Sequence, residues 1–415
     1  MSNSEEPPHK KRNMEPSPPS SSSLLSSLPA DVALNCLARV SREDRAALSL
    51  TSKSYRSLVA SQELYKTRSL IGRTETHVYV CLRTPPPNPN LRWYILRRRN
   101  GSSDLFPIPS LASQPPEASA VVALDWGIYV IGGLINGKPT PDAWLLDCRT
   151  HTWRSLPSME VARANAATGV VDGKIYVLGG CDDVKWGEVF DPKTQMWKTL
   201  PLIRKKGSAD VDVHGSLVRD QKVYLFSGKN GTFYYSPRER KWGRGNRDQV
   251  RGNRRDWCMV DGLICCISSY GGVFWCEPDA LDWREPEGIM CTKEVRGLGS
   301  LLMRLFYSRV VHFGEQLIHW WDQYKVNHVI PKKFGVSHEL EYLLPGARMS
   351  TSGRNMLLFW DVVEGDRLEI WCAEISLERH QGGDVRGNIE WSSAVMTVDP
   401  FVDHYKVLHS VSVTL

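Results

Sequence analysis

Residues 172–201, DGKIYVLGGCDDVKWGEVFDPKTQMWKTLP, contain the pattern that decides the fold. Asp172 opens a turn, an apolar run with strand spacing follows it, and the run ends in two consecutive glycines. A second turn begins at Asp191 and reaches Trp197 six residues later. Leu200-Pro201 then ends the unit, because proline cannot continue a ladder of hydrogen bonds. The stretch predicts one repeat of short antiparallel strands.

The same markers recur along the chain at a period in the forties. The turn aspartates advance by 47, 48 and 41 residues, and they are Asp125, Asp172, Asp220 and Asp261. The tryptophans after the second turn advance by 44, 45 and 41 residues, and they are Trp153, Trp197, Trp242 and Trp283. The glycine pair is present in the first two units and lost from the next two. Two markers that advance together indicate an internal repeat.

This combination of a glycine pair, an acidic turn and a tryptophan resembles the kelch repeat. The resemblance implies a mainly β fold, a kelch-type propeller of four-stranded blades over residues 76–415. Residues 76–110 supply three strands of a blade without its innermost strand, and the alternating segment 407–415 is expected to complete that blade and close the ring. Six blades result, the last with an insertion at about residues 323–350. Seven blades remain possible if that long stretch holds a second, degenerate one.

A different pattern, with helical spacing, occupies residues 24–70. After Leu28-Pro29, apolar residues from Val32 to Val40 form one face of a short helix, with Asp31 in its first turn. Residues 45–50 and 54–59 predict two more helices, the last capped by Ser52 or Thr51. Three short helices have too little core to be stable alone, so their remaining apolar face needs a partner.

With a propeller after it, this segment resembles an F-box. The resemblance implies that its Leu-Pro step and following apolar residues bind a Skp-type adaptor, which bridges to a cullin and a RING subunit. By position, the contact role falls on Leu28, Pro29, Asp31, Leu34, Leu37, Leu48 and Tyr55. The chain would then be the non-catalytic substrate-recognition subunit of a ubiquitin ligase. The alternatives are that the helices only cap the propeller, or that the chain is a kelch scaffold without a ligase.

Two places in the predicted propeller are candidates for target contact. Arg163 and Asn165 precede an inner strand of a well-preserved repeat, where family members carry loops near the central channel; alternatively, Arg163 ties neighbouring blades together. The arginine-rich loop 243–256 could bind an acidic or phosphorylated target, or could be a solvated loop. It lacks the interleaved aromatic residues of single-strand nucleic-acid binders, so no nucleic-acid partner is expected.

Composition narrows the remaining function classes. The net charge of +6 is mild, and the ten cysteines form no CxxC pair, which favours buried free thiols in a reducing compartment, the cytoplasm or the nucleus or both. Residues 1–23 are too polar to order themselves, and Lys10-Lys11-Arg12 is either a nuclear import patch or a solvated charge run. We expect no membrane span, no metal or other cofactor, and no catalysis, since no signal peptide, long apolar run, paired metal-ligating histidines or catalytic motif appears.

Overall fold

The computed structural model describes residues 28–83, 91–99, 101–115, 118–181, 185–202, 213–227, 231–245, 255–268, 271–281, 293–307, 310–313, 316–319, 347–364, 367–398 and 405–415. The chain divides into two compact units, Met1–Thr74 and Glu75–Leu415. The predictions of a disordered tail over residues 1–23, of an import patch at Lys10-Lys11-Arg12 and of a marker role for Trp283 lie outside the described residues. So does most of the arginine-rich loop.

The first unit holds four helices rather than the three that the sequence predicted. They are α1 (Ala30–Arg39), α2 (Arg42–Thr51), α3 (Lys53–Ala60) and α4 (Gln62–Leu70). Serine side chains accept the first free backbone N–H groups of α2, α3 and α4, from Ser41, Ser52 and Ser61. The additional helix α4 buries only Leu64 and Arg68, so it shows no apolar stripe that a sequence pattern could detect.

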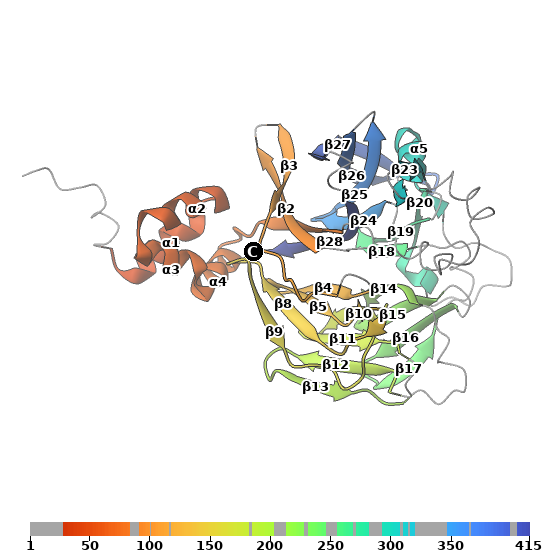
Figure 1. Cartoon of the computed structure of the whole chain (residues 1–415), viewed down its shortest axis with the longest axis horizontal. Coiled ribbons are helices and arrows are strands. Elements are labelled where there is room, and N and C mark those ends of the chain that lie inside the picture. The colour runs from red at the N-terminus through yellow and green to blue at the C-terminus, as the bar shows by residue number, and fades with distance from the viewer. Residues whose placement is uncertain are drawn as a thin grey trace, which may run out of the picture. The chain divides into compact units, whose positions relative to one another are not determined.

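The second unit contains six four-stranded antiparallel sheets, which are the blades of a six-bladed propeller (Figure 1). From the innermost to the outermost strand the sheets are β28 (Lys406–Thr414), β1 (Thr76–Arg83), β2 (Leu91–Arg99), β3 (Ser102–Pro107); β4 (Ala120–Leu124), β5 (Gly127–Ile131), β8 (Ala143–Asp147), β9 (Thr152–Leu156); β10 (Ala167–Val171), β11 (Lys174–Leu178), β12 (Gly187–Asp191), β13 (Met196–Thr199); β14 (Val213–Arg219), β15 (Lys222–Ser227), β16 (Gly231–Ser236), β17 (Lys241–Arg244); β18 (Arg255–Val260), β19 (Leu263–Ile267), β20 (Val273–Cys276), β21 (Lys293–Glu294); and β24 (Arg348–Ser352), β25 (Asn355–Glu364), β26 (Arg367–Arg379), β27 (Val385–Val398). We number these blades one to six in that order.

Four smaller elements connect the blades. Two hairpins stand outside the sheets, β6 (Leu134–Ile135) with β7 (Lys138–Pro139), and β22 (Val310–Phe313) with β23 (Gln316–His319). A 3-10 turn η3 (Pro278–Leu281) and a helix α5 (Gly299–Tyr307) complete the unit. The predicted insertion at 323–350 extends too far, because Arg348 already begins strand β24; residues 323–346 lie outside the described residues.

The two ends of the second unit meet in blade one. Strand β28 pairs antiparallel with β1, from Thr76 opposite Thr414 to Arg83 opposite Lys406. The inner strands then pack side by side in the order β4, β10, β14, β18, β24 and β28, and β28 packs again on β4. The C-terminal strand therefore closes the ring and leaves no inner strand with an open neighbour.

The repeat markers have structural counterparts in the blades. All four turn aspartates adopt left-handed backbone conformations, with φ between 46° and 52°, between the first and second strands of their blades. Asp is one of the few residues that accept this conformation, which explains its recurrence. The indole N–H of Trp153, Trp197 and Trp242 donates to the carbonyl of Pro109, Pro157 and Pro201 respectively, at 2.7–2.8 Å. Each marker tryptophan thus bonds to the end of the preceding blade.

No helix within the described ranges is long and apolar enough to cross a membrane.

Candidate functional site

The helical unit has a small apolar core. Leu37 and Ala38 of α1 and Leu64 of α4 are buried, and six half-buried residues pack on them: Leu34, Leu48, Tyr55, Leu58, Tyr65 and Ile71. Arg68 of α4 donates to the carbonyls of Ala38 and Val40 at 2.8 and 3.0 Å. These bonds satisfy carbonyls at the C-terminal end of α1, so α4 holds α1 in place through a charged side chain.

Several apolar side chains of the helical unit remain at its surface. Leu28 and Val32 are 36% and 40% exposed, and Leu50 and Leu70 are 79% and 87% exposed. Pro29 is also exposed, and its carbonyl accepts the N–H groups of Val32 and Ala33 at 3.0 Å. Because Leu28, Pro29 and Val32 are joined through this first turn of α1, the Leu-Pro step presents an apolar surface on a fixed backbone.

The predicted adaptor contacts separate into three groups in the structure. Leu28, Pro29 and Asp31 are exposed, and Leu34, Leu48 and Tyr55 are half-buried. Leu37 is 3% exposed and packs in the helical core, so its predicted role as a contact is wrong. The sequence analysis did not select Val32 or Leu50 as contacts; Val32 lies four residues after Leu28, a helical spacing that could have found it.

On the propeller, the loop of residues 157–166 joins blade two to blade three and lies against the glycine pairs of both. The N–H of Gly133 donates to the carbonyl of Arg163 at 2.8 Å, and the N–H of Ala164 donates to Gly180 at 2.8 Å. A Cβ on Gly132 would lie 2.4 Å from the carbonyl oxygen of Arg163, and one on Gly180 would lie 2.4 Å from that of Ala164. Only glycine permits this approach, which accounts for the conserved spacing of the pair within this chain.

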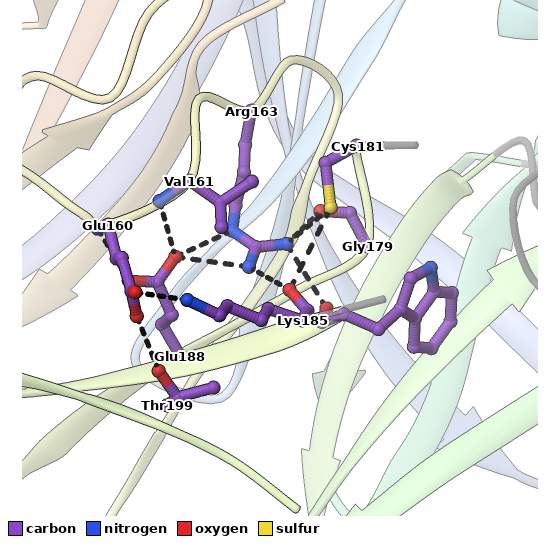
Figure 2. Close-up of polar contacts among 9 residues, drawn as sticks. Glu160, Val161, Arg163, Gly179, Cys181, Lys185, Glu188 and Thr199 are labelled. Carbon is purple, nitrogen blue, oxygen red and sulfur yellow. Dashed lines mark hydrogen bonds and ion pairs between the residues drawn. The ribbon is translucent and has the colours of Figure 1, made fainter. Parts of the chain in front are cut away.

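A buried ion pair fixes the same loop (Figure 2). The guanidinium of Arg163 donates to Oε2 of Glu188 on β12, with N–O distances of 3.0 and 3.2 Å, and both side chains are at most 1% exposed. The Glu188 carboxylate also accepts the backbone N–H of Glu160 at 2.7 Å and of Val161 at 3.3 Å. The remaining N–H groups of Arg163 donate to the carbonyls of Gly179, Lys185 and Trp186 and to the sulfur of Cys181.

These contacts correct the target-binding prediction for Arg163. The side chain is 0% exposed and every contact of the guanidinium is internal, so Arg163 ties the loop between blades two and three to blade three, which was the alternative role. Asn165 is exposed, with φ of 55° and its N–H bound to the carbonyl of Ala118, so it remains a candidate contact. The signal that sequence reasoning lacked was the ring of carbonyls, which only folding brings together.

The exposed part of this loop carries a second ion pair. Lys185 contacts the carboxylate of Glu160, and Thr199 donates to the other carboxylate oxygen at 2.8 Å (Figure 2). The hydrogen bond from Lys185, followed by that from Thr199, lowers the pKa of Glu160. Glu160 therefore stays ionised at neutral pH, and the loop presents a paired charge at the surface.

Comparison with known proteins agrees with both units. The family model described as "FKB95, Kelch-repeats domain" matches residues 93–333, and the F-box domain model matches residues 25–67. The putative F-box/kelch-repeat protein At3g24610 of Arabidopsis thaliana is 40% identical, with 98% of this chain and 97% of that protein covered. The F-box/kelch-repeat protein At4g39580 of the same plant is 34% identical over the whole of both chains. A solved structure titled "Structure of YjhT" is similar at a TM-score of 0.39 and 13% identity, covering 72% of this chain and 91% of that one, and carries no argument.

The fold and the exposed Leu-Pro surface define a kelch-type propeller protein with an N-terminal F-box. The chain belongs to the F-box/kelch-repeat protein family. The F-box domain implies that the chain binds a Skp-type adaptor.

Proposed function

We propose that this chain is the substrate-recognition subunit of a Skp–cullin–F-box ubiquitin ligase. The helical unit binds the Skp-type adaptor and, through it, the cullin and RING subunits, while the propeller holds a target protein. Ubiquitin transfer belongs to the partner enzymes, so the chain itself has no catalytic step. We further propose that it acts in the cytoplasm, the nucleus or both.

One observation carries the adaptor-binding part of the proposal. Leu28, Val32 and Leu50 stand exposed on a unit whose own buried apolar core consists of Leu37, Ala38 and Leu64. Covering such side chains removes apolar surface from water, which is the main favourable term in protein association. A helical unit with a small core and a large apolar surface gains stability and affinity together when a partner helix covers that surface.

The propeller supports the target-binding part of the proposal. Its loops stand on a closed ring of sheets, and the loop of residues 157–166 is held by the buried pair of Arg163 and Glu188. A loop that is ordered before binding loses little conformational freedom when a target arrives. Asn165 and Glu160, which are exposed on this loop, are the residues that we expect to contact the target.

Adaptor capture by the full chain tests the proposal. We expect the double variant Leu28→Ser/Val32→Ser to bind a recombinant Skp-type adaptor at least roughly tenfold more weakly than the wild type in a calorimetric titration, since buried apolar anchors dominate such interfaces. Leu202→Ser is the matched control, because Leu202 is a leucine of the propeller that is 58% exposed. Undiminished adaptor binding by the double variant would refute the proposed interface.

A second measurement separates a ligase subunit from a kelch scaffold that works without one. In a reconstituted reaction with adaptor, cullin and RING subunits, the wild-type chain should support ubiquitination of proteins that it captures, and the double variant should not. Capture of the same proteins by both variants, with ubiquitination lost only in the double variant, is the expected pattern. Proteins that bind the wild-type chain without ever being ubiquitinated would favour the scaffold.

A further inference from the structure

A cavity of about 540 Å³ lies beside helix α5 at the outer edges of blades five and six (Figure 1). This volume falls within the range of roughly 300–1,000 Å³ that small-molecule sites occupy. Its walls come from β20, from β21 and the residues after it, from α5, and from the turn before β27. Neither the exposed leucines of the helical unit nor the loop of residues 157–166 contributes to it.

Backbone hydrogen bonds hold the walls of the cavity in place. The N–H of Val295 donates to Val273 of β20 at 2.9 Å, and the next residue leaves that edge and pairs with β27 instead. There the N–H of Arg296 donates to Val385 at 2.9 Å, and the N–H of Gly387 donates to Arg296 at 2.8 Å. The chain therefore bridges two blades at this point, and the cavity under the bridge is a built feature of the fold.

One side of the cavity is apolar. Val273 and Val295 are 3% exposed, and Leu298 and Leu305 are 6% and 3% exposed and belong to the core between blades five and six. Leu302 lies on the same face of α5, four residues after Leu298 and three before Leu305, yet it is 36% exposed. The wall thus keeps an apolar side chain in water, and a ligand with an apolar body would cover it.

The other side of the cavity is basic. Arg296 pairs with Asp384 at 3.0 Å, but their side chains are 72% and 38% exposed, and an ion pair of such exposure stabilises by less than about 1 kcal/mol. An arriving anion can therefore compete for Arg296. The ammonium of Lys293 lies 5.5 Å from the ring centre of Trp275 and forms no ion pair with any carboxylate of the described residues. Glu294 is the remaining charged residue of the lining.

The start of α5 adds a partial positive charge to the basic side. The carbonyl of Leu298 accepts the N–H groups of Leu301 and Leu302 at 2.9 and 3.1 Å, so the helix begins directly after Leu298. Leu298 and Gly299 have no side-chain oxygen that could cap the helix, and both line the cavity. The helix dipole therefore favours a negative group at the same end as Lys293 and Arg296.

We propose that this cavity binds a small organic anion that has an apolar body, such as an aryl or branched alkyl carboxylate, sulfonate or phosphate. The apolar body lies against Leu302 and Val273, and the anionic group lies between Lys293 and Arg296. The site is separate from the proposed adaptor and target surfaces, so it would make the propeller a receptor for a small molecule as well as for a protein. Its failure would leave the proposed ligase function untouched.

Two fluorescent probes test the site on the full chain. One is 8-anilinonaphthalene-1-sulfonate, and the other is N-phenyl-1-naphthylamine, which has the same apolar body without the sulfonate. We expect Arg296→Glu to weaken the sulfonate probe roughly fivefold and the neutral probe less than about twofold, because the substitution reverses one exposed charge. Leu302→Asp should weaken the sulfonate probe roughly tenfold and should also weaken the neutral probe.

Ile135→Asp is the matched control, because Ile135 is an exposed apolar residue, at 39%, on the separate hairpin of β6 and β7. It should leave the affinity of both probes unchanged. The exposed leucines of the helical unit can also bind such probes, so the result is the difference between variants. Equal effects of Arg296→Glu on the two probes, or equal effects of Leu302→Asp and Ile135→Asp, would overturn the proposal. Arg296 is exposed, so its variant remains informative even if Leu302→Asp fails to fold.

Discussion

The two units of this protein place their apolar and charged side chains in opposite ways. The helical unit buries three apolar residues and leaves Leu50 and Leu70 almost fully exposed. The propeller collects its apolar residues in clusters between neighbouring sheets and also buries charged pairs, Arg163 with Glu188 and Lys406 with Asp361. The small unit is therefore incomplete without a partner, whereas the large unit is closed on itself.

The difference shows how each unit can bind. Exposed leucines on a small core favour a constitutive partner that completes the fold, which fits an adaptor. Buried charges in the propeller stabilise little by themselves, but they hold loops in one conformation, which fits recognition of a chosen target by preformed loops. The four predictions below break or sharpen this contrast, beginning with the largest effect.

Removing residues 406–415 should have the largest effect of all. The truncation takes away strand β28, leaves β1 without its inner neighbour and leaves the buried carboxylate of Asp361 without Lys406. We expect a loss comparable with the ~5–15 kcal/mol by which whole domains are stable, seen as insoluble or protease-sensitive protein. Thr414→Ala, an exposed change on the same strand, is the control. A soluble, protease-resistant truncation would mean that the ring does not depend on β28.

Glu188→Leu should destabilise the propeller by about 3–5 kcal/mol, because it leaves the guanidinium of Arg163 buried without a carboxylate. All 15 tryptophans lie after residue 92, so tryptophan fluorescence during denaturation reports on the propeller alone. The double variant Glu188→Leu/Arg163→Met should recover most of the loss, since neither charge is then buried alone. A double variant less stable than Glu188→Leu would show that the carbonyl contacts of Arg163 matter more than the ion pair.

In the helical unit, burial rather than residue type should decide the effect of losing a leucine. Leu64→Ala should cost about 2–5 kcal/mol, because Leu64 is 0% exposed at the centre of the core. Leu50→Ser should change stability by less than about 0.5 kcal/mol, because Leu50 is 79% exposed, yet it should weaken adaptor binding. The ellipticity at 222 nm during thermal unfolding measures the first effect. Comparable destabilisation by both changes would contradict the assignment of Leu50 to a free surface.

Acid should weaken the propeller through His409. Burial, followed by the charge of Arg348, lowers the pKa of His409 to about 3, whereas the unfolded chain has the ordinary value near 6.5. Below pH 6.5 the unfolded state binds the proton and the folded state does not, so stability falls as pH falls from 6.5 toward 3. At pH 5 the loss is roughly 2 kcal/mol. His409→Gln should remove this part of the slope in fluorescence-monitored unfolding.

The helical unit sharpens the acid prediction, because residues 28–74 contain no histidine. Its helical signal should therefore change less than the tryptophan signal between pH 7 and pH 5. An acid slope in tryptophan fluorescence that is identical in wild type and His409→Gln would assign the effect to other groups.

Local patterns predicted the propeller because its markers act over a few residues. A left-handed turn needs Asp, a close backbone approach needs Gly132 and Gly180, and an indole such as Trp197 reaches the preceding blade from a fixed offset. Six blades follow from the spacing of these markers. Helix α4 was missed because its contribution to the core is a single leucine and the arginine at position 68, which form no apolar stripe.

The site residues were harder to predict than the fold. Leu34 and Leu37 lie on one predicted apolar face, and a helical period does not show which part of that face meets the protein's own core. Similarly, an arginine beside a loop suggests a surface contact until its acceptors are known. The acceptors of Arg163 come from residues up to 25 positions away, and no spacing rule connects them.

The amino-acid sequence by itself determined the repeat, the strand order within a blade and the helical Leu-Pro segment, because turns, periodicity and capping depend on neighbours in the chain. Only the tertiary structure decided which leucines are covered, where Arg163 points and how Arg296 bridges two blades beside α5. Those outcomes depend on groups that are distant in sequence, and burial is a property of the packed molecule rather than of any segment.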